Sequence, residues 1–276
     1  MGLRINQNIA AMNAYRNLSV NDTQMGKALE KLSSGFRINR AADDAAGLSI
    51  SESLRSQIGG LKVAVRNSQD GISVVQTAEG ALNETQSILQ RMRDLTVQAS
   101  SGGSNDTTSQ TAANTEFAQL NIELDRIANS TSYGSQKLLD GNYAGVFQIG
   151  STSVTANDQV TVTITQADST TLTTAGQDLT TSAGALTAMD AVDVALATVS
   201  ASRSELGATQ NRFEHTINSL NVAVENLSAS ESRIRDTDMA QEMVSYTRSQ
   251  ILSQAGTAML AQANSAPQSV LQLLRG

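Results

Sequence analysis

The sequence predicts a mainly α-helical protein: a long antiparallel, coiled-coil-like helix bundle with a small β-hairpin region in the middle of the chain. The first observation is composition, because aromatic residues make up only 3% of the 276 residues and the single proline is Pro267. The second is apolar residues at heptad spacing, which suit long helices packed side by side. The third is a run of alternating β-branched residues at 160–165 (VTVTIT), which is typical of a half-buried strand.

The N-terminal half contains several segments with helical spacing. Apolar residues recur at intervals typical of a helix face along residues 18–36, 54–65, 72–89 and 117–127. A cluster of Ser, Gly and Asn at 100–106 (SSGGSND) interrupts the pattern and predicts a turn. Helices on either side of a short turn form an antiparallel hairpin, so we expect one here.

The middle of the chain changes character, since residues 140–178 are rich in Gly, Thr and Val. We expect residues 147–149 to pair with the strand at 160–165, with Asn157 and Asp158 in the connecting turn. The Thr/Ser-rich stretch 169–182 reads as a loop or an exposed edge.

A long C-terminal helix is expected to begin near Ser182. It carries a heptad seam that is interrupted by polar residues at Arg203, Gln210 and Glu231, and a period of 3.5 residues implies supercoiling against a partner helix. The apolar seam residues are Val192, Leu196, Val199, Leu206, Phe213, Ile217, Leu220, Val224, Leu227 and Ile234.

Both ends of the chain carry more apolar surface than one helix stripe holds. Apolar residues near the C-terminus come in adjacent pairs, and neighbours on a helix point about 100° apart. Burial contributes roughly 1.5–3 kcal/mol per side chain, whereas ordering costs roughly 1–2 kcal/mol per residue. We therefore expect residues 1 to about 40 and 236–276 to be disordered in a monomer and helical where neighbouring subunits cover them. The pairs are Ile251–Leu252, Met259–Leu260, Val270–Leu271 and Leu273–Leu274.

Composition excludes several kinds of function. The chain has no cysteine, which removes disulfides, thiolate metal sites and thiol nucleophiles. His215 is the only histidine, so a histidine-based metal or catalytic cluster is excluded, and a solvated or inter-subunit position is expected for it. A net charge of -7 argues against nucleic-acid binding. No apolar run approaches the roughly 20 residues of a membrane span, and no cleavable secretory signal is recognisable.

Patterns that resemble enzyme sites have simpler interpretations. Asp43 and Asp44 could form a carboxylate pair, but adjacent helix residues do not converge on one ligand, and capping of the following helix is the favoured role. Arg37 and Arg40 are expected to pair with them. The glycine pairs at 59–60 and 102–103 lack a phosphate-binding pattern. The many hydroxyls have no base to activate one, so we expect no enzyme activity, no cofactor and no metal.

The chain closely resembles bacterial flagellins across nearly its whole length. The resemblance depends on long blocks that occur in the same order at both ends. These blocks lie at 4–8 (RINQN), 32–39 (LSSGFRIN), 43–47 (DDAAG), 67–76 (NSQDGISVVQ), 79–83 (EGALN), 90–98 (QRMRDLTVQ), 206–213 (LGATQNRF), 232–236 (SRIRD), 250–264 (QILSQAGTAMLAQAN) and 267–275 (PQSVLQLLR).

The resemblance implies an exported subunit that polymerises into the extracellular flagellar filament for swimming motility. Residues 1–44 and 235–276 would form the inner tube, and 45–234 a helical rod with a β-rich segment at about 141–178. Larger flagellins carry variable outer domains in place of that segment, so a short flagellin without them is expected. Export without a cleaved signal peptide is implied too.

The resemblance also implies partners. These are other copies of the chain, a flagellar export chaperone at the C-terminal segment, hook-associated and cap proteins, and host Toll-like receptor 5; nucleic acid and membrane insertion are not expected. The expected inter-subunit core contacts are Ile5, Ile9, Leu18, Ile251, Leu252, Met259, Leu260, Val270, Leu271, Leu273 and Leu274.

The receptor contacts that the resemblance implies are Arg91, Leu95 and Glu116. Arg91 and Leu95 are four residues apart and share a helix face. The midpoint between Arg91 and Glu116 falls in the turn at 100–106, so an antiparallel hairpin would bring these two residues level. Asp94 stands where glutamate is commoner in such receptor-detected flagellins.

Two other classes remain open from the sequence. A hook–filament junction protein shares coiled-coil ends with flagellin, although the intact blocks at 250–264 and 267–275 favour flagellin. A secreted adhesin or effector could contain a similar coiled coil without polymerising.

Overall fold

The computed structural model describes the backbone of residues 7–101, 106–152 and 155–275, and their side chains apart from those of 155–156 and 266–275. The chain is mainly α-helical with a small β region. It forms two compact units, of which one combines Met1–Ser56 with Asn226–Gly276 and the other is Gln57–Glu225. The expected division at residues 44 and 235 refers to filament layers and stays a prediction.

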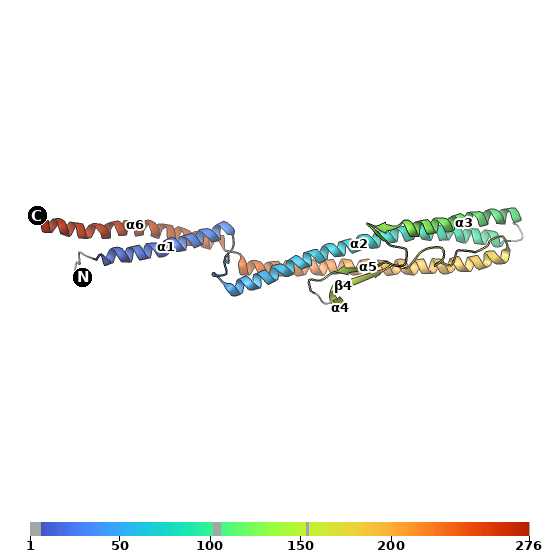
Figure 1. Ribbon diagram of the computed structural model, residues 1–276, viewed down its shortest axis with the longest axis horizontal. Coiled ribbons are helices and arrows are strands. Elements are labelled where there is room, and N and C mark those ends of the chain that lie inside the picture. Colours follow the sequence, from blue (N-terminus) through green and yellow to red (C-terminus); the bar gives the residue numbers. More distant parts are fainter. Residues whose placement is uncertain (1–6, 102–105, 153–154, 276) are drawn as a thin grey trace. The chain divides into compact units, whose positions relative to one another are not determined.

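The first unit pairs helix α1 (Ile9–Ser34) with helix α6 (Met239–Arg275). The two helices lie side by side and run in opposite directions (Figure 1). Their register is fixed near the start of α1, where the Asn8 amide donates a hydrogen bond of 2.7 Å to the carbonyl of Ala263.

Local sequence signals set the ends of α1. The Asn8 side chain accepts a hydrogen bond of 3.1 Å from the Ala11 N–H, which caps the first turn. At the other end Gly35 adopts the left-handed conformation with a φ of 75°, and its N–H donates to the carbonyl of Lys31 over 2.8 Å. A glycine suits this position because it has no Cβ to oppose a positive φ.

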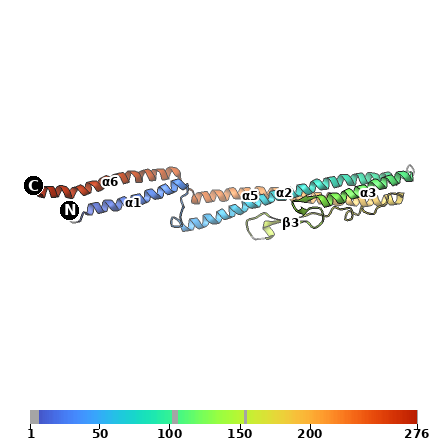
Figure 2. The ribbon, with the colours of Figure 1, turned by 45° about the horizontal axis from the view of Figure 1, so that its top comes forward.

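The second unit contains parts of α2 (Ala45–Ser100) and α5 (Ser182–Arg235) together with α3 (Thr107–Ser130). Helix α3 folds back along α2 (Figure 2), which is the predicted hairpin. Helix α5 runs antiparallel to α2, and Arg93 of α2 forms an ion pair of 2.6 Å with Asp193 of α5.

One hydrophobic core holds these helices together, and the predicted heptad seam lies in it. From Val192 to Phe213 the seam residues at intervals of seven are buried. Large aliphatic and aromatic residues from α2 and α3 complete the core; they include Leu82, Leu89, Met92, Phe117 and Leu124.

The chain between α3 and α5 holds the predicted β region. Strands β1 (Ser132–Tyr133) and β2 (Gln136–Lys137) form one antiparallel pair, and β3 (Ala144–Gln148) and β4 (Gln159–Thr163) form another. The short helix α4 (Thr155–Asp158) connects β3 to β4. The expected hairpin is therefore present, although its strands start earlier than predicted and its connection is a helical turn.

The register of β3 and β4 agrees with the alternation in the sequence. Phe147 lies opposite Val160, and its ring meets the Phe213 ring edge-on at 5.6 Å between centroids. Val160 and Val162 are buried, whereas Thr161 is exposed. The ribbon thus buries the face that carries its apolar residues.

The expectation that the Thr/Ser-rich stretch 169–182 is an exposed edge or loop was partly wrong. It contains no strand, but Leu172, Thr174 and Leu179 are buried. Asp125 of α3 holds the start of the stretch, because its carboxylate accepts hydrogen bonds from the Ser169 N–H at 2.8 Å and the Ser169 hydroxyl at 3.0 Å. Because the stretch is polar overall, its composition did not reveal that Leu172 and Leu179 belong to the hydrophobic core.

One helix, α5, is long and apolar enough to be compared with a membrane span, although the sequence was expected to contain no such segment. Its most apolar 18-residue window reaches a mean hydropathy of 1.3, which meets the length and composition of a membrane span, and 28% of that window is buried. The many alanines produce this average without a continuous run of large apolar residues. The core helix of a water-exposed bundle gives the same signal, so the feature is weak support for membrane insertion.

Candidate assembly surface

The first unit leaves much of its apolar surface uncovered. Of the predicted inter-subunit contacts, Ile9 is 57% exposed, Ile251 60% and Met259 62%, and Leu252 is also exposed. Ile5 lies outside the described residues. The side chains of Val270, Leu271, Leu273 and Leu274 are likewise outside the described part of the chain, although their backbone belongs to α6.

Two predicted contacts lie partly within the subunit itself. Leu18 is half-buried, and its Cδ1 lies only 3.3 Å from the position that a Cβ on Gly256 would occupy. Leu260 is also half-buried. The small residue at 256 lets α1 and α6 approach each other, so Leu18 serves the pairing of these helices as well as any contact between subunits.

Two exposed apolar pairs lie one after the other along one side of α6. We call this set the α6 stripe and define it as Met243, Val244, Ile251 and Leu252, all of which are exposed. Residues spaced by four or eight share a helix face, so these side chains line one shallow groove together with Thr247 and Arg248. Sequence reasoning missed Met243 and Val244, although they form an adjacent apolar pair like those it selected.

A second apolar surface lies where α1 and α6 meet. We call it the α1/α6 groove; its apolar lining includes Met12, Tyr15 and Val20 from α1 and Leu260 from α6. Tyr15 is 66% exposed. Contiguous exposed apolar patches are characteristic of protein–protein contacts, so the first unit presents two candidate contact surfaces.

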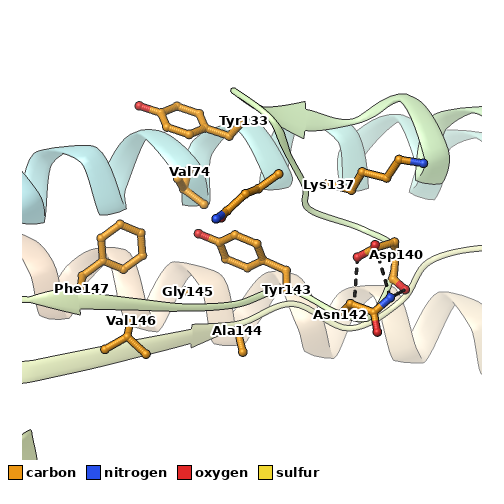
Figure 3. A pocket seen from close by; sticks show the side chains of 11 residues that line it. Val74, Tyr133, Lys137, Asp140, Asn142, Tyr143, Ala144, Gly145, Val146 and Phe147 are labelled. Carbon is orange, nitrogen blue, oxygen red and sulfur yellow. Dashed lines mark hydrogen bonds between the residues drawn. The ribbon is translucent and has the colours of Figure 1, made fainter.

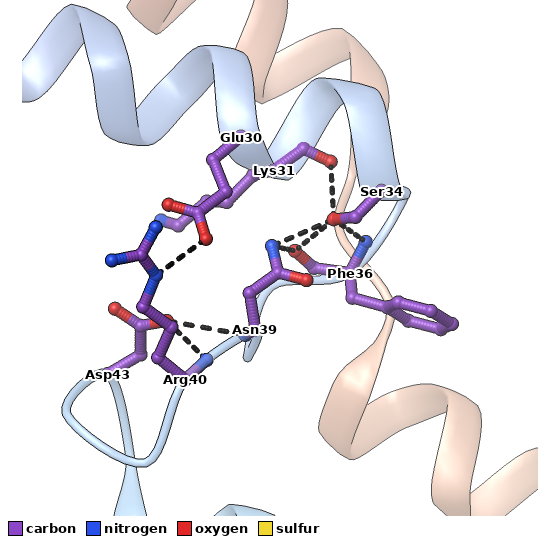
Figure 4. Close-up of polar contacts among 7 residues, drawn as sticks. All are labelled: Glu30, Lys31, Ser34, Phe36, Asn39, Arg40 and Asp43. Carbon is purple, nitrogen blue, oxygen red and sulfur yellow. Dashed lines mark hydrogen bonds and ion pairs between the residues drawn. The ribbon is translucent and has the colours of Figure 1, made fainter.

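The connector between α1 and α2, residues 35–44, is held by polar contacts (Figure 4). The Asp43 carboxylate accepts hydrogen bonds from the backbone N–H groups of Asn39 and Arg40, at 3.2 and 3.0 Å. The bond from Arg40 lowers the pKa of Asp43 below its ordinary value, more than the bond from Asn39 does. Asp44 caps α2 by accepting a 2.8 Å bond from the Gly47 N–H, so the capping interpretation of this acidic pair is confirmed.

The arginines of the connector do not pair with these aspartates as expected. The Arg40 guanidinium donates to Glu30 of α1 over 2.8 Å, and Arg37 donates to the carbonyl of Ile234 over 2.5 Å. The carboxylates of both aspartates instead accept hydrogen bonds from backbone N–H groups, and these donors compete with the arginine side chains for the aspartates. The prediction of arginine–aspartate pairs was therefore wrong.

The connector also contacts the end of α5. The Phe36 ring lies beneath the Arg235 guanidinium, 4.7 Å from ring centroid to Cζ, which is within the range of a cation–π contact. The same guanidinium donates to Glu52 of α2 over 2.9 Å. Arg235 thus links the connector to the helix that follows it.

In the second unit, α2 and α3 bring Arg91 and Glu116 level, as the hairpin geometry predicted. The Arg91 Nε donates to the Glu116 carboxylate over 2.8 Å. This hydrogen bond lowers the pKa of Glu116 and raises that of Arg91. Leu95, the third expected receptor contact, is only 2% exposed, so its side chain packs in the core and offers no surface in this state.

The single histidine and the acidic residues are the remaining candidates for metal ligands. His215 is exposed. Within residues 7–101, 106–152 and 155–275, no group of three or more His, Cys, Asp or Glu side chains is placed to hold a metal ion.

Comparison with known proteins identifies the family. Residues 5–144 match the model of the bacterial flagellin N-terminal helical region, and residues 189–274 match that of the bacterial flagellin C-terminal helical region. This chain belongs to the bacterial flagellin family.

Individual flagellins match along almost their full length. The chain is 56% identical to a flagellin of Halalkalibacterium halodurans over 274 residues, which covers 98% of this chain and 99% of that relative. It is 48% identical to a flagellin of Bacillus subtilis, with 99% and 100% covered. It is 45% identical to the flagellar filament 33 kDa core protein of Treponema phagedenis, with 98% and 99% covered.

Solved structures also resemble the chain. A crystal structure of Bacillus cereus flagellin is 31% identical and covers 56% of this chain and 88% of that one, with a TM-score of 0.49. A structure described as a flagellar hook-associated protein of Vibrio parahaemolyticus covers 70% of this chain and 100% of that one, with a TM-score of 0.59. At 12% identity this second likeness concerns the fold alone.

Proposed function

We propose that this chain is the exported structural subunit of an extracellular flagellar filament and polymerises through the surfaces of α1 and α6. The observation that carries the proposal is the exposed apolar surface of the first unit, which a lone subunit leaves in water. The α6 stripe and the α1/α6 groove are different patches of one chain. Contacts between unlike patches repeat head to tail, and they generate an open helical polymer where the rotation between subunits does not close into a ring.

The flagellin relatives support this assignment over the alternatives. The Treponema phagedenis relative is named as a filament core protein and matches over nearly its whole length. The hook–filament junction protein has no comparable support, since the hook-associated structure shares only the fold. Membership in a family of structural proteins supports a role without catalysis, and with no cofactor or metal.

Polymerisation by the purified chain tests the proposal. Protein concentrated with salt should form long filaments that are visible by negative-stain electron microscopy. Replacing Ile251 and Leu252 together by serine should leave a folded monomer that forms none, because each side chain loses its apolar contribution at the contact. Val222→Ser provides a matched control, since Val222 is exposed on α5 in the second unit. Filaments from the Ile251/Leu252 variant would contradict the proposed surface.

The extreme C-terminus is proposed to contribute to the same contacts. Replacing Leu271, Leu273 and Leu274 together by alanine should also give a monomer that cannot polymerise. We further propose that residues 1 to about 40 and 236–276 are disordered in the free monomer, and that α1 and α6 take up the paired helical form described above when neighbouring subunits cover them. Circular dichroism before and after polymerisation should then show a gain of helix, and terminal segments that resist protease in the monomer would contradict this.

The remaining partners are proposed on the family relationship. They are a flagellar export chaperone that binds the C-terminal segment, hook-associated and cap proteins at the filament ends, and host Toll-like receptor 5 at Arg91 and Glu116. We propose no nucleic-acid partner, since the net charge is -7, and no membrane insertion. Leu95, the third residue proposed at the receptor contact, would act through the core by supporting the helix face that carries Arg91.

A further inference from the structure

A cavity of about 540 Å³ lies beside β3, where Tyr143 and Phe147 point toward α2 (Figure 3). Its lining includes Lys137 and also Asp140, so it carries charged groups of both signs. Such a mixed lining favours no single class of ligand. The joints between the long helices of the first unit, in contrast, are built from contacts that converge on one side chain.

The first unit has two such joints, and backbone hydrogen bonds connect them to each other. One joint is the connector between α1 and α2, and the other is the turn at 236–238 between α5 and α6. Phe36 and Asp236 form an isolated antiparallel bridge between them. Beside this bridge, the Arg37 N–H donates to the Arg235 carbonyl over 2.6 Å. The two joints therefore take up their structure together.

One arginine side chain links both joints to α2. The Arg235 guanidinium lies 4.7 Å from the centroid of the Phe36 ring, measured at Cζ, and its Nη1 donates to the Glu52 carboxylate over 2.9 Å. The Arg235 side chain is only 15% exposed. Within the described part of the chain, its Nε is buried without a hydrogen-bond partner. The carboxylate and the ring therefore replace much of the water that this cation has lost. We call Arg235, Glu52 and Phe36 the Arg235 clamp.

The Phe36 ring is directed into the clamp by polar contacts on the other side of its backbone. The Phe36 N–H donates to the Ser34 hydroxyl over 3.1 Å, and the Asn39 amide donates to the Phe36 carbonyl over 3.2 Å. In Figure 4 the ring points away from these two side chains. All three residues are close in sequence, so these bonds form at little cost in loop-closure entropy.

The clamp joins segments that differ in when they are expected to order. Glu52 belongs to α2 and Arg235 to α5, and both lie outside the segments that we propose to be disordered in the free monomer. Phe36 lies inside the first of those segments. The Arg235–Glu52 ion pair can therefore be in place before the terminal segments order, as a site that receives the Phe36 ring.

The pairing of α1 with α6 extends from the joints toward the chain ends. Next to the joints, the Lys31 ammonium lies 3.9 Å from the Glu242 carboxylate. At the far end, Asn8 donates to the carbonyl of Ala263. A first contact at the far end would close a loop that contains nearly all of α1 and much of α6, and the entropic cost of closure rises with loop length. A first contact at the joints closes the shortest loop.

We propose that the pairing of α1 with α6 begins at the Arg235 clamp as a subunit joins the assembly, with Arg235 as the positioning residue that receives the Phe36 ring. This inference rests on the proposed function, since it concerns segments that order when neighbouring subunits cover them. Contacts formed at the start of an ordering step control its forward rate, whereas contacts formed later control the reverse rate. The clamp and the far end of α1 should therefore affect filament growth and disassembly differently.

The rates of filament growth and disassembly of the full-length chain test the proposal. Light scattering measures elongation when monomer is added to short, sheared filaments of the parent chain, and it measures subunit loss when filaments of each variant are diluted. Arg235→Gln removes the charge of the clamp. Arg233→Gln is the matched control, because Arg233 is an exposed arginine in the same last turn of α5 and donates to Ser230 over 3.0 Å.

Arg235→Gln should slow elongation about fivefold and leave the rate of subunit loss nearly unchanged, as expected for an enclosed cation–π contact that forms early. Phe36→Leu should do the same, and its effect cannot come from misfolding of α2 or α5, because Phe36 lies outside both helices. Asn8→Ala, at the far end of α1, should speed subunit loss and leave elongation unchanged. Arg233→Gln should change neither rate.

Two results would overturn the inference. One is elongation of Arg235→Gln and Phe36→Leu at the rate of Arg233→Gln. The other is faster subunit loss as the main effect of both changes, because the clamp would then form late. Thermal unfolding shows whether monomeric Arg235→Gln is folded, and Phe36→Leu alone decides if it is not. A parent chain that forms no filaments would instead remove the proposed function, so the two failures are distinguishable.

Discussion

The Phe213 ring of α5 lies directly against the backbone of Gly71 in α2. A Cβ at Gly71 would come within 2.8 Å of the ring's Cζ atom. Phe213 is fully buried and also meets Phe147 of β3. Glycine at this position therefore lets one aromatic side chain join both long helices of the second unit to the β ribbon.

Gly71→Ala is expected to lower the free energy of unfolding. Overpacking of a filled core costs about 1–3 kcal/mol, which exceeds the 0.5–1 kcal/mol or so that alanine gains over glycine in a helix. Urea unfolding of the monomer measures the change. Gly80→Ala is the matched control in the same helix, because a Cβ at Gly80 meets nothing within 4 Å, and it should stabilise.

A smaller side chain at position 213 should reduce the destabilisation caused by Gly71→Ala, which would show that the Phe213 ring is its cause. Combining Gly71→Ala with Phe213→Leu should cost less than the sum of the two single changes, since the leucine leaves room for the new methyl group. Strict additivity would mean that Phe213 is not what opposes the Cβ.

The stretch between β4 and α5 is predicted to contribute to stability despite its polar composition. Leu172→Ala should lower the free energy of unfolding by about 2–5 kcal/mol, the usual cost of removing a buried leucine side chain. Thr171→Ala, at an exposed neighbour, should change it by less than about 0.5 kcal/mol. Thermal and urea unfolding check both.

Replacing part of this stretch by a linker tests the same prediction in another way. The exposure expected from the sequence implied that residues 166–178 could be replaced by a short Gly/Ser linker without loss of filaments. With Leu172 and Thr174 buried and Ser169 bonded to Asp125, we now expect the linker variant to be destabilised. A variant that is as stable as the parent chain would contradict the importance of these buried residues.

The contrast between the seam and this stretch shows what the sequence could predict. Val192 and Phe213 were assigned to the core because a heptad pattern repeats over many turns, and repetition makes the signal strong. The strand at 160–165 was expected from alternation in a β-branched run, whereas the register that places Phe147 opposite Val160 was not predicted. Leu172 and Leu179 are isolated among Thr and Ser, so no period marked them. Hydrogen bonds to side chains of α3, such as Asp125 and Asn114, help to hold that loop.

The connector shows a different limit. Arg40 pairs with Glu30 across ten residues of sequence, whereas the sequence suggested a nearer aspartate. Charge alone could not distinguish these partners, because the backbone N–H groups that bond to Asp43 are set by the path of the chain.

At the assembly surface, the exposure of Ile251 and Met259 was foreseeable from adjacent apolar pairs. The groove that combines Tyr15 with Leu260 depends on how α1 and α6 are aligned, which the sequence did not specify.

The Arg91–Glu116 ion pair is predicted to disappear on acidification. Because the hydrogen bond from Arg91 lowers the pKa of Glu116 from an ordinary value of 4.5, its contribution to stability is present above that value and is lost as the pH falls through the lower folded pKa. Double-mutant cycles with Arg91→Ala and Glu116→Ala should show favourable coupling at neutral pH, and this coupling should disappear as the pH falls below the lowered pKa of Glu116. In an NMR titration, Arg91→Ala should return the pKa of Glu116 toward its ordinary value.

Recognition by host Toll-like receptor 5 is predicted to use the exposed part of this same face. Monomeric protein should activate receptor reporter cells, and Arg91→Ala should weaken activation because Arg91 and Glu116 together present a charged pair on adjacent helices. Arg126→Ala is a suitable control, since Arg126 forms an exposed pair with Glu123 elsewhere on α3. Intact filaments should be poor activators if subunit contacts cover this face. A monomer that gives no response at high concentration, or an Arg91→Ala variant as active as the Arg126→Ala control, would contradict the assignment of Arg91 to receptor binding.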